Sequence, residues 1–301
     1  MYKELEQILP HDILYYNEPL KKHSTFRIGG PAQLLAVPEN ECQLKKLFSY
    51  IKEHHIPFIV LGNGSNVLFS DKGFAGIVIK LGTQYSGITQ EEYGDLVLLR
   101  AKAGTLLSKL ANYACEAGLE GLEFAAGIPG SVGGAILMNA GAYDGEIAQV
   151  LKESRCFDID NMEIQSKSYE EHYFSYRHSS YEEDGKIILE GVFCLKRGNK
   201  AEILDKIKAL NARRIEKQPL EFPSAGSTFK RPAGNFAGKL IEECGLKGFR
   251  IGGAMVSEKH CGFIINVGNA TCNDVVGVIE YVRNTVLEKK GILLETEVKI
   301  I

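Results

Sequence analysis

The turn Gly-Asn-Gly-Ser-Asn at residues 62–66 combines glycines with hydroxyl and amide side chains directly after an apolar run. Glycine lets successive backbone N–H groups converge on one anion, and Ser65 and Asn66 add side-chain donors. The turn lacks the Lys-Ser/Thr of a Walker loop, and Val67 stands where the third glycine of a dinucleotide fingerprint belongs. The pattern predicts an anion-binding turn, with an ordinary turn between strands as the alternative.

A second stretch of small residues, 121–145, holds seven of the chain's 32 glycines. A backbone of Gly, Ala and Ser can lie directly against a flat or phosphorylated ligand. Pro129 fixes one φ angle and marks a turn within the stretch. Ligand binding and the tight packing of a turn on a sheet explain this composition equally well.

Two further stretches carry ionic and hydroxyl groups. Ser227 lies in a small-residue turn with Lys217, Lys230 and Arg231 near it in sequence, as an anionic ligand requires. The turn has no Gly-x-Ser-x-Gly elbow, so an acyl-enzyme is not favoured, and a structural turn serine is the alternative. Arg177, in a segment rich in tyrosine, can grip a carboxylate with its planar fork or simply stack on its neighbours.

The last predicted strand, residues 292–301, places Glu295, Glu297 and Lys299 on one face by alternation. A carboxylate there is usually solvated and has a role only if that face lines a cleft. His172 and His178 are six residues apart, a spacing that does not put two ligands on one helical face. We expect both to be structural or exposed, and we expect no metal site.

The composition excludes several classes of protein. A net charge of -3 gives no field for nucleic acid or a membrane surface, and no apolar run reaches the ~20 residues of a membrane span. Seven cysteines without paired spacing suit a reducing cytosol. The start shows no apolar signal core, so we expect a cytoplasmic protein of one large or two modest domains.

Periodicity predicts alternating helices and strands. Helices are expected at 39–55, 105–117, 201–217, 236–244 and from 271 to a glycine at 291, after a helical lead-in at 1–24. Strands are expected at 25–32, 56–61, 76–81, 95–101, 151–159, 162–168, 187–196, 263–267 and 292–301.

The motifs occur in one order along nearly the whole chain. They are Gly-Asn-Gly-Ser-Asn, Ala126-Gly-Ile-Pro-Gly-Ser-Val-Gly-Gly134, Tyr176-Arg177, Gly226-Ser227-x-Phe229 and Leu294-Glu-x-Glu297-Val. Residues 25–30 and Asn139-Ala-Gly-Ala-Tyr143 fit the same set. In this combination the sequence resembles the MurB family of UDP-N-acetylenolpyruvoylglucosamine reductases, in the shorter subgroup without a lid insertion.

The resemblance implies an α+β fold with two domains. An FAD-binding domain of the vanillyl-alcohol-oxidase type would span residues 1–199, completed by 292–301, and a smaller α+β substrate-binding domain would span 200–291. Two loops would hold non-covalent FAD and its diphosphate. Their residues are Gly62, Asn63, Gly64, Ser65 and Asn66 in one loop, and Gly127, Ile128, Pro129, Gly130, Ser131 and Gly134 in the other.

The resemblance also implies a reaction and the residues that perform it. NADPH would reduce the flavin, which would reduce the enolpyruvyl group of a UDP-sugar in peptidoglycan synthesis. Arg177 matches the residue that stabilises the developing negative charge, Ser227 matches the proton donor, and Glu297 matches the carboxylate at the same centre. Lys217 and Arg231 are expected near the substrate diphosphate, although some members carry Asn in place of Arg231. A monomer is expected.

Two rival functions remain at this stage. An oxidase on the same flavin fold would need a His or Cys for covalent flavin attachment, and no residue in the sequence recommends itself. A nucleotide-sugar-binding protein without catalysis would not need Arg177, Ser227 and Glu297 together.

Overall fold

The computed structural model describes residues 2–301 and divides the chain into two compact units. The first unit comprises the residues up to Tyr16 together with Leu34–Asn63 and Gly76–Arg213. The second unit comprises Asn17–Gln33, Gly64–Ala75 and Arg214–Ile301.

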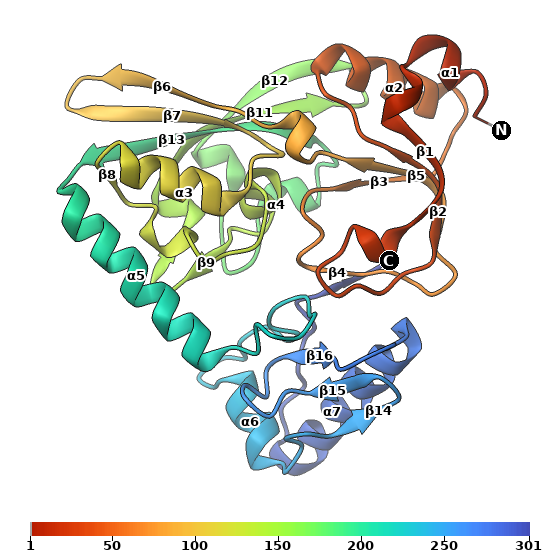
Figure 1. The fold of residues 1–301 in the computed structure, drawn as a ribbon, viewed down its shortest axis with the longest axis vertical. Coiled ribbons are helices and arrows are strands. Elements are labelled where there is room, and N and C mark those ends of the chain that lie inside the picture. Colours follow the sequence, from red (N-terminus) through yellow and green to blue (C-terminus); the bar gives the residue numbers. More distant parts are fainter. Residues whose placement is uncertain (1) are drawn as a thin grey trace. The chain divides into compact units, whose positions relative to one another are not determined.

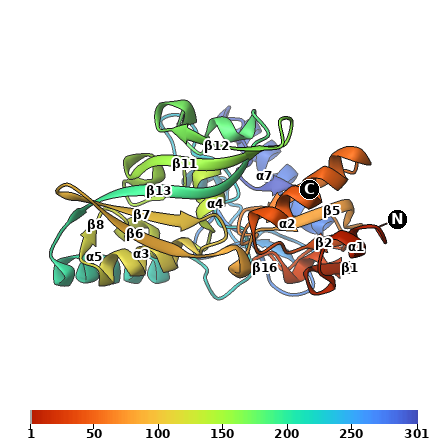
Figure 2. The ribbon, with the colours of Figure 1, turned by 90° about the horizontal axis from the view of Figure 1, so that it is seen from above.

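The main sheet of the first unit is antiparallel and has the strand order β12-β11-β13-β7-β6, with β8 pairing with β13. Its strands are β6 (Ile88–Tyr93), β7 (Leu96–Lys102), β8 (Leu119–Glu120), β11 (Leu151–Asp158), β12 (Glu163–Ser168) and β13 (Ile187–Arg197). Helices α3 (Leu107–Glu116) and α4 (Val132–Leu137) lie on the same face of this sheet (Figures 1 and 2). α3 buries Leu107, Leu110 and Ala114 at helical spacing, which explains its attachment to that face.

A smaller sheet has the order β1-β2-β5-β3. Its strands are β1 (Leu14–Pro19), β2 (Pro31–Ala36), β3 (Phe58–Leu61) and β5 (Phe74–Lys80). The short helix α1 (Leu5–Ile8) precedes it, and α2 (Glu41–Glu53) begins at Asn40, whose side chain accepts from the Gln43 amide. The Phe48 ring of α2 stacks on Phe157 of β11 at 5.2 Å between centroids, so the two sheets share one core.

The second unit is built on a three-stranded antiparallel sheet of β14 (Arg250–Ile251), β15 (Ala254–Val256) and β16 (Ile264–Asn266). Helices α6 (Ala237–Glu243) and α7 (Cys272–Lys290) bury their apolar stripes in its core. α7 starts with a capping box between Thr271 and Asp274 and ends at Gly291 in the left-handed conformation. In the same unit, β17 (Lys299–Ile300) pairs in parallel with β4 (Val67–Leu68).

The helix α5 (Lys200–Lys217) starts in the first unit and ends in the second. Its predicted bounds, and those of α2, α6 and α7, are confirmed to within a few residues. No helix within residues 2–301 is long and apolar enough to cross a membrane.

Three predicted elements are wrong. Residues 25–30 are not a strand, because β2 begins only at Pro31, after the Gly-Gly turn. The lead-in at 1–24 is helical only at Leu5–Ile8 and the single turns His11–Ile13 and Leu20–Lys22, with β1 between those turns. The predicted final strand is regular only at Lys299–Ile300, with one further bridge from Thr296 to Phe229. By compactness residues 292–301 lie in the second unit. The assignment of residues 1–199, 200–291 and 292–301 to ligand-binding domains stays a prediction.

Candidate active site

The two loops predicted to hold the flavin meet in the first unit. The Asn63 side-chain amide donates to the Pro129 carbonyl at 2.5 Å. A Cβ on Gly62 would collide with Ser131 Oγ, so only glycine allows this approach. The structure therefore brings together Gly62 and Asn63 with Pro129, Gly130 and Ser131, which come from stretches more than sixty residues apart.

The second loop is fixed from both sides. The Gly130 carbonyl accepts from the Leu107 amide, and the Val132 and Gly133 amides donate to residues 105 and 103, all at 2.8–2.9 Å. Ser131 caps α4 by accepting from the Gly134 amide at 3.4 Å. The backbone of residues 130–133 is thereby fixed by the first turn of α4 and by the segment that leads into α3.

The rest of the first loop belongs to the second unit. Gly64 has φ +67°, and a Cβ there would collide with the His23 carbonyl, so this position also requires glycine. The Gly64 carbonyl accepts from the Thr25 amide at 3.0 Å. The Asn66 side chain donates to the Glu297 carbonyl at 3.2 Å, so one predicted cofactor residue also holds a predicted catalytic strand.

These loops fit a flavin nucleotide by their chemistry. They offer mainly backbone, with small hydroxyl and amide side chains, which is the donor set that a diphosphate needs. Ser24, whose Cα would lie 3.0 Å from a Cβ on Gly64, has a buried hydroxyl with no hydrogen-bond partner within residues 2–301. A ligand can supply that partner, since a buried polar group without one is costly.

Arg177 occupies a tight turn in the first unit. Ser175 and His178 exchange backbone hydrogen bonds of 3.2 and 3.3 Å, and Arg177 between them has φ +56°. Its guanidinium donates to the Gly141 carbonyl at 3.0 Å and lies 5.0 Å from the centroid of the exposed Tyr176 ring. The turn thus presents a half-buried cation whose guanidinium is oriented by the Gly141 carbonyl.

The segment that carries this turn is anchored at both ends by Ser154 of β11. Ser154 Oγ lies 2.8 Å from His172 Nε2 and 2.6 Å from the Tyr181 hydroxyl, and all three side chains are buried. His172 Nδ1 lies 3.2 Å from the Tyr169 carbonyl. Burial lowers the pKa of His172, and a neutral ring that donates from Nδ1 and accepts at Nε2 satisfies every partner.

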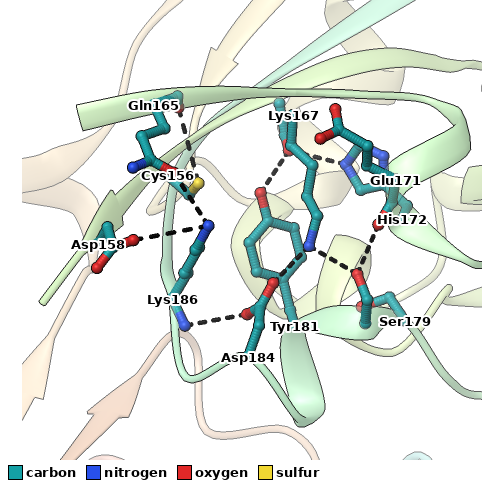
Figure 3. Close-up of polar contacts among 12 residues, drawn as sticks. Cys156, Asp158, Gln165, Lys167, Glu171, His172, Ser179, Tyr181, Asp184 and Lys186 are labelled. Atoms are coloured by element: carbon teal, nitrogen blue, oxygen red, sulfur yellow. Dashed lines mark hydrogen bonds and ion pairs between the residues drawn. The ribbon is translucent and has the colours of Figure 1, made fainter. Parts of the chain in front are cut away.

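A charged group closes this network (Figure 3). Lys167 extends over the Tyr181 ring at 4.3 Å and donates to Asp184 and to the Ser180 hydroxyl at 2.5 and 2.7 Å. Burial raises the pKa of Tyr181, so the phenol stays protonated and donates. Residues 172–181, which include Arg177, are therefore fixed at both ends by buried hydrogen bonds to Ser154.

Ser227 and Glu297 are neighbours in the second unit. The residue after Ser227, the buried Thr228, accepts from the Glu297 amide through its carbonyl at 2.8 Å. The Thr228 amide donates to the Gly262 carbonyl at 2.8 Å, and its hydroxyl accepts from the Ile264 amide at 3.1 Å. Gly226, at φ +75°, has open space where a side chain would be, and Ser227 beside it is partly exposed. Thr228 thus holds the serine and the carboxylate on adjacent, paired backbones.

The two predicted diphosphate residues differ. Lys217 is the exposed last residue of α5. The guanidinium of Arg231 lies 4.8 Å from the exposed Phe236 ring. Lys259, which the sequence interpretation did not single out, donates to the Ile215 carbonyl at 2.7 Å and so adds a cation at the end of the helix that carries Lys217.

Other contributors were also missed. Asn139 and Gly141 contact the Arg177 turn, and only the motif Asn-Ala-Gly-Ala-Tyr pointed to this stretch, without a role. One group of possible metal ligands occurs within residues 2–301, formed by His178, Glu182 and Glu183. It is a surface cluster in which His178 Nδ1 lies 3.2 Å from a Glu182 carboxylate oxygen.

Comparisons with known proteins agree along the whole chain. A protein 51% identical over 298 residues, covering 99% of this chain and 97% of its own, is UDP-N-acetylenolpyruvoylglucosamine reductase of Caldanaerobacter subterraneus. The enzyme of the same name from Clostridium perfringens is 48% identical over 100% of this chain and 97% of its own. This chain belongs to the UDP-N-acetylenolpyruvoylglucosamine reductase family. A family model for the C-terminal domain of that reductase matches residues 218–301, and an FAD binding domain model matches residues 32–162.

The solved structures agree as well. The crystal structure of MurB from Thermus caldophilus matches with a TM-score of 0.79 and 37% identity over 95% of this chain and 97% of that one. The α+β class with an FAD-binding domain and a further C-terminal domain is thereby confirmed. As a member of this reductase family, the chain is a flavin-dependent oxidoreductase.

Proposed function

We propose that this protein reduces the enolpyruvyl ether of UDP-N-acetylglucosamine enolpyruvate to UDP-N-acetylmuramate, with non-covalent FAD as cofactor and NADPH as hydride source. The observation that carries the proposal is the 51% identity to a reductase of that name over 99% of the chain. The product is a peptidoglycan precursor, so the reaction contributes to cell wall synthesis and through it to cell shape and division. We place it in the cytoplasm and expect a monomer.

When bound by the two glycine loops, FAD would accept hydride from NADPH and supply it to the substrate. Hydride addition at the methylene carbon leaves negative charge at the neighbouring carbon and its carboxylate. Arg177 stabilises that charge, because a fixed guanidinium favours charge that develops in the transition state. Ser227 delivers the proton to that carbon, and Glu297, whose amide donates to the carbonyl of the adjacent Thr228, acts at the same centre.

The remaining site residues bind and orient. Gly62, Asn63, Gly64, Ser65 and Asn66 with Gly127, Ile128, Pro129, Gly130, Ser131 and Gly134 form the backbone of the flavin loops. Lys217, with Arg231, provides positive charge for the substrate diphosphate.

A single substitution separates the two halves of this reaction. Ser227→Ala removes the proton donor, so reoxidation of reduced flavin by the enolpyruvyl substrate should slow on the order of 10²–10⁴-fold. Bleaching of the flavin by NADPH should stay near the wild-type rate, because that step needs no donor over the substrate. Stopped-flow absorbance of the flavin measures both. Ser227→Cys should recover part of the rate, since a thiol can donate from nearly the same place.

Ser224→Ala is the matched control, because Ser224 lies in the same turn and contacts Thr25 through its backbone carbonyl. It should leave both half-reactions unchanged. Wild-type reoxidation in Ser227→Ala would make Ser227 a packing residue and would assign the proton to water or Glu297. If the protein were an oxidase, its reduced flavin would be reoxidised by oxygen instead of by the enolpyruvyl substrate. If it were only a binding protein, it would not turn over the substrate.

A further inference from the structure

Asn139 is a buried amide that connects two segments by backbone contacts. It follows α4, has φ +40° and is 1% exposed. Its Nδ2 donates to the Ser175 carbonyl at 3.0 Å, and its Oδ1 accepts from the Ala148 amide at 2.9 Å. Both the nitrogen and the oxygen of the side-chain amide are therefore hydrogen-bonded. Their partners lie 36 and nine positions away along the chain.

The first contact fixes the backbone of the Arg177 turn. The Ser175 carbonyl that receives the Asn139 amide also accepts from the His178 amide and closes the turn. Arg177 at φ +56° is strained for a residue with a side chain, and such a conformation persists only when its surroundings over-determine it. The Ser179 hydroxyl adds a bond to the Leu137 carbonyl at 2.8 Å, so the end of α4 holds this segment twice.

The second contact fixes the group that orients the guanidinium. Arg177 donates to the Gly141 carbonyl, and Gly141 belongs to β9 (Gly141–Ala142), which pairs with β10 (Gly145–Glu146) just before Ala148. A Cβ on Gly141 would lie 2.6 Å from the Gly145 carbonyl oxygen, and one on Gly145 would lie 2.6 Å from the Phe124 ring. Neither glycine of the hairpin has room for a side chain, and Asn139 accepts from the Ala148 amide just after the hairpin.

Helix α4 connects Asn139 to the loop that fits the flavin. The helix is capped by Ser131, in the loop that fits the flavin, and its last residue, Leu137, lies two positions before Asn139. Its six residues and the two contacts of Asn139 thus form one short connection from the cofactor loop to Arg177.

We infer that Asn139 is a positioning residue for Arg177, which sets the guanidinium relative to the flavin loop during substrate reduction. The inference rests on the proposed role of Arg177. Asn139 itself does not contact the substrate. Its side chain acts only through the backbone of Ser175 and through the hairpin that precedes Ala148.

Asn139→Asp tests this at nearly constant size. The variant keeps an acceptor for the Ala148 amide but directs a second oxygen at the Ser175 carbonyl. Reoxidation by substrate should slow about 10- to 100-fold near pH 8, the loss expected from a small misplacement of a catalytic group. Flavin reduction by NADPH should stay within about twofold of wild type. At lower pH the introduced carboxyl can take up a proton and donate to Ser175, so reoxidation should recover relative to wild type.

Two comparisons separate positioning from a general structural effect. Asn269→Asp is the matched control, because Asn269 is an exposed asparagine with φ +53°. It should leave both rates unchanged. In an Arg177→Ala background, Asn139→Asp should slow reoxidation no further, because its effect passes through the guanidinium.

An equal slowing in that background would overturn the inference, as would a wild-type rate of reoxidation in Asn139→Asp. If Asn139→Asp does not fold, Asn139→Gly tests the same point, since glycine accepts the positive φ and lacks only the amide. Unchanged reoxidation in Arg177→Ala alone is a different result. It would remove Arg177 from the proposed mechanism, and the inference with it.

Discussion

Arg177 shows how hydrogen bonds from other segments can hold one cation in a tight turn. Its positive φ costs of order 1–3 kcal/mol. The Asn139 side chain donates to the Ser175 carbonyl in the same turn, and the Gly141 carbonyl accepts from the guanidinium. These contacts hold the strained turn in one conformation, so the guanidinium has a defined position.

For Lys217, another single residue, we expect an effect on the binding of the UDP-sugar. Lys217→Ala should raise the KM for the UDP-sugar about 10- to 100-fold, the value of a lost charge-assisted hydrogen bond of about 1.5–3 kcal/mol. Arg231→Ala should have a smaller effect, because that guanidinium is engaged with Phe236. Steady-state kinetics with varied substrate measure both.

The matched control is Lys208→Ala on the same helix, where the lysine pairs with Asp205 in solvent. It should change neither KM nor kcat. An equal loss of NADPH oxidation in the absence of substrate would remove Lys217 from the diphosphate site.

The proposed site residues can be named from the sequence, but the residues that support them cannot. Ser227, Arg177 and Glu297 each lie in a short motif, and the side chain of each has a chemical group that suits the proposed reaction. Asn139 and Ser154 act through hydrogen bonds to segments 36 and 18–27 positions away, and no local pattern encodes such a partner. Thr228 lies between two motif residues and is buried. Its backbone and its hydroxyl bond to residues 262, 264 and 297, which are all outside its own turn.

At the scale of elements, we propose that the contact between the two glycine loops positions the cofactor. Gly62→Ala places a methyl group against Ser131 Oγ and must displace one loop. Overpacking of this kind costs about 1–3 kcal/mol, so FAD should bind about tenfold more weakly or worse. Titration of the apoprotein with FAD, followed by flavin fluorescence, measures the change.

Gly87→Ala is the control, since a Cβ there would meet only the flexible Lys102 side chain, at 3.7 Å. It should bind FAD as wild type does. If Gly62→Ala also bound FAD normally, the contact between the loops would have no part in holding the cofactor.

Elements with a self-contained signal were predicted well. α7 has an apolar stripe, a capping box and a glycine stop, so its bounds follow from local sequence. Residues 292–301 also alternate, but only two of them form a regular strand, because pairing depends on β4 from a distant part of the chain. Strand formation in short segments is decided by such partners rather than by propensity.

At the scale of the whole molecule, each unit contains a histidine that burial keeps neutral. Burial lowers the pKa of His172 in the first unit and of His260 in the second below the ordinary value of 6.5. Around His172, the Lys167 charge acts in the same direction, while Glu171 and the hydrogen bond to Tyr169 oppose it. Protonation of either ring in the folded state is therefore disfavoured.

The sign of the pH dependence follows from these shifts. Below pH 6.5 the unfolded chain binds more protons at these histidines than the folded one, so stability should fall as pH decreases from 6.5 and should be fully present above it. Asp158 and Asp274, whose carboxyl pKa values are lowered chiefly by backbone hydrogen bonds, act only below their ordinary value of 3.8. Between about pH 5 and 6.5 the histidines should therefore dominate over these two carboxylates.

His172→Gln should reduce the change in the urea midpoint between about pH 6.5 and 5, because an amide does not titrate in that range. It should also lower the midpoint at neutral pH, since the contact with Ser154 is weakened. His260→Gln should flatten the dependence for the second unit, and the exposed His11→Gln should leave the profile unchanged. Circular dichroism during urea titration at several pH values measures this. A profile for His172→Gln as steep as that of wild type would show that the buried ring does not control acid stability in this range.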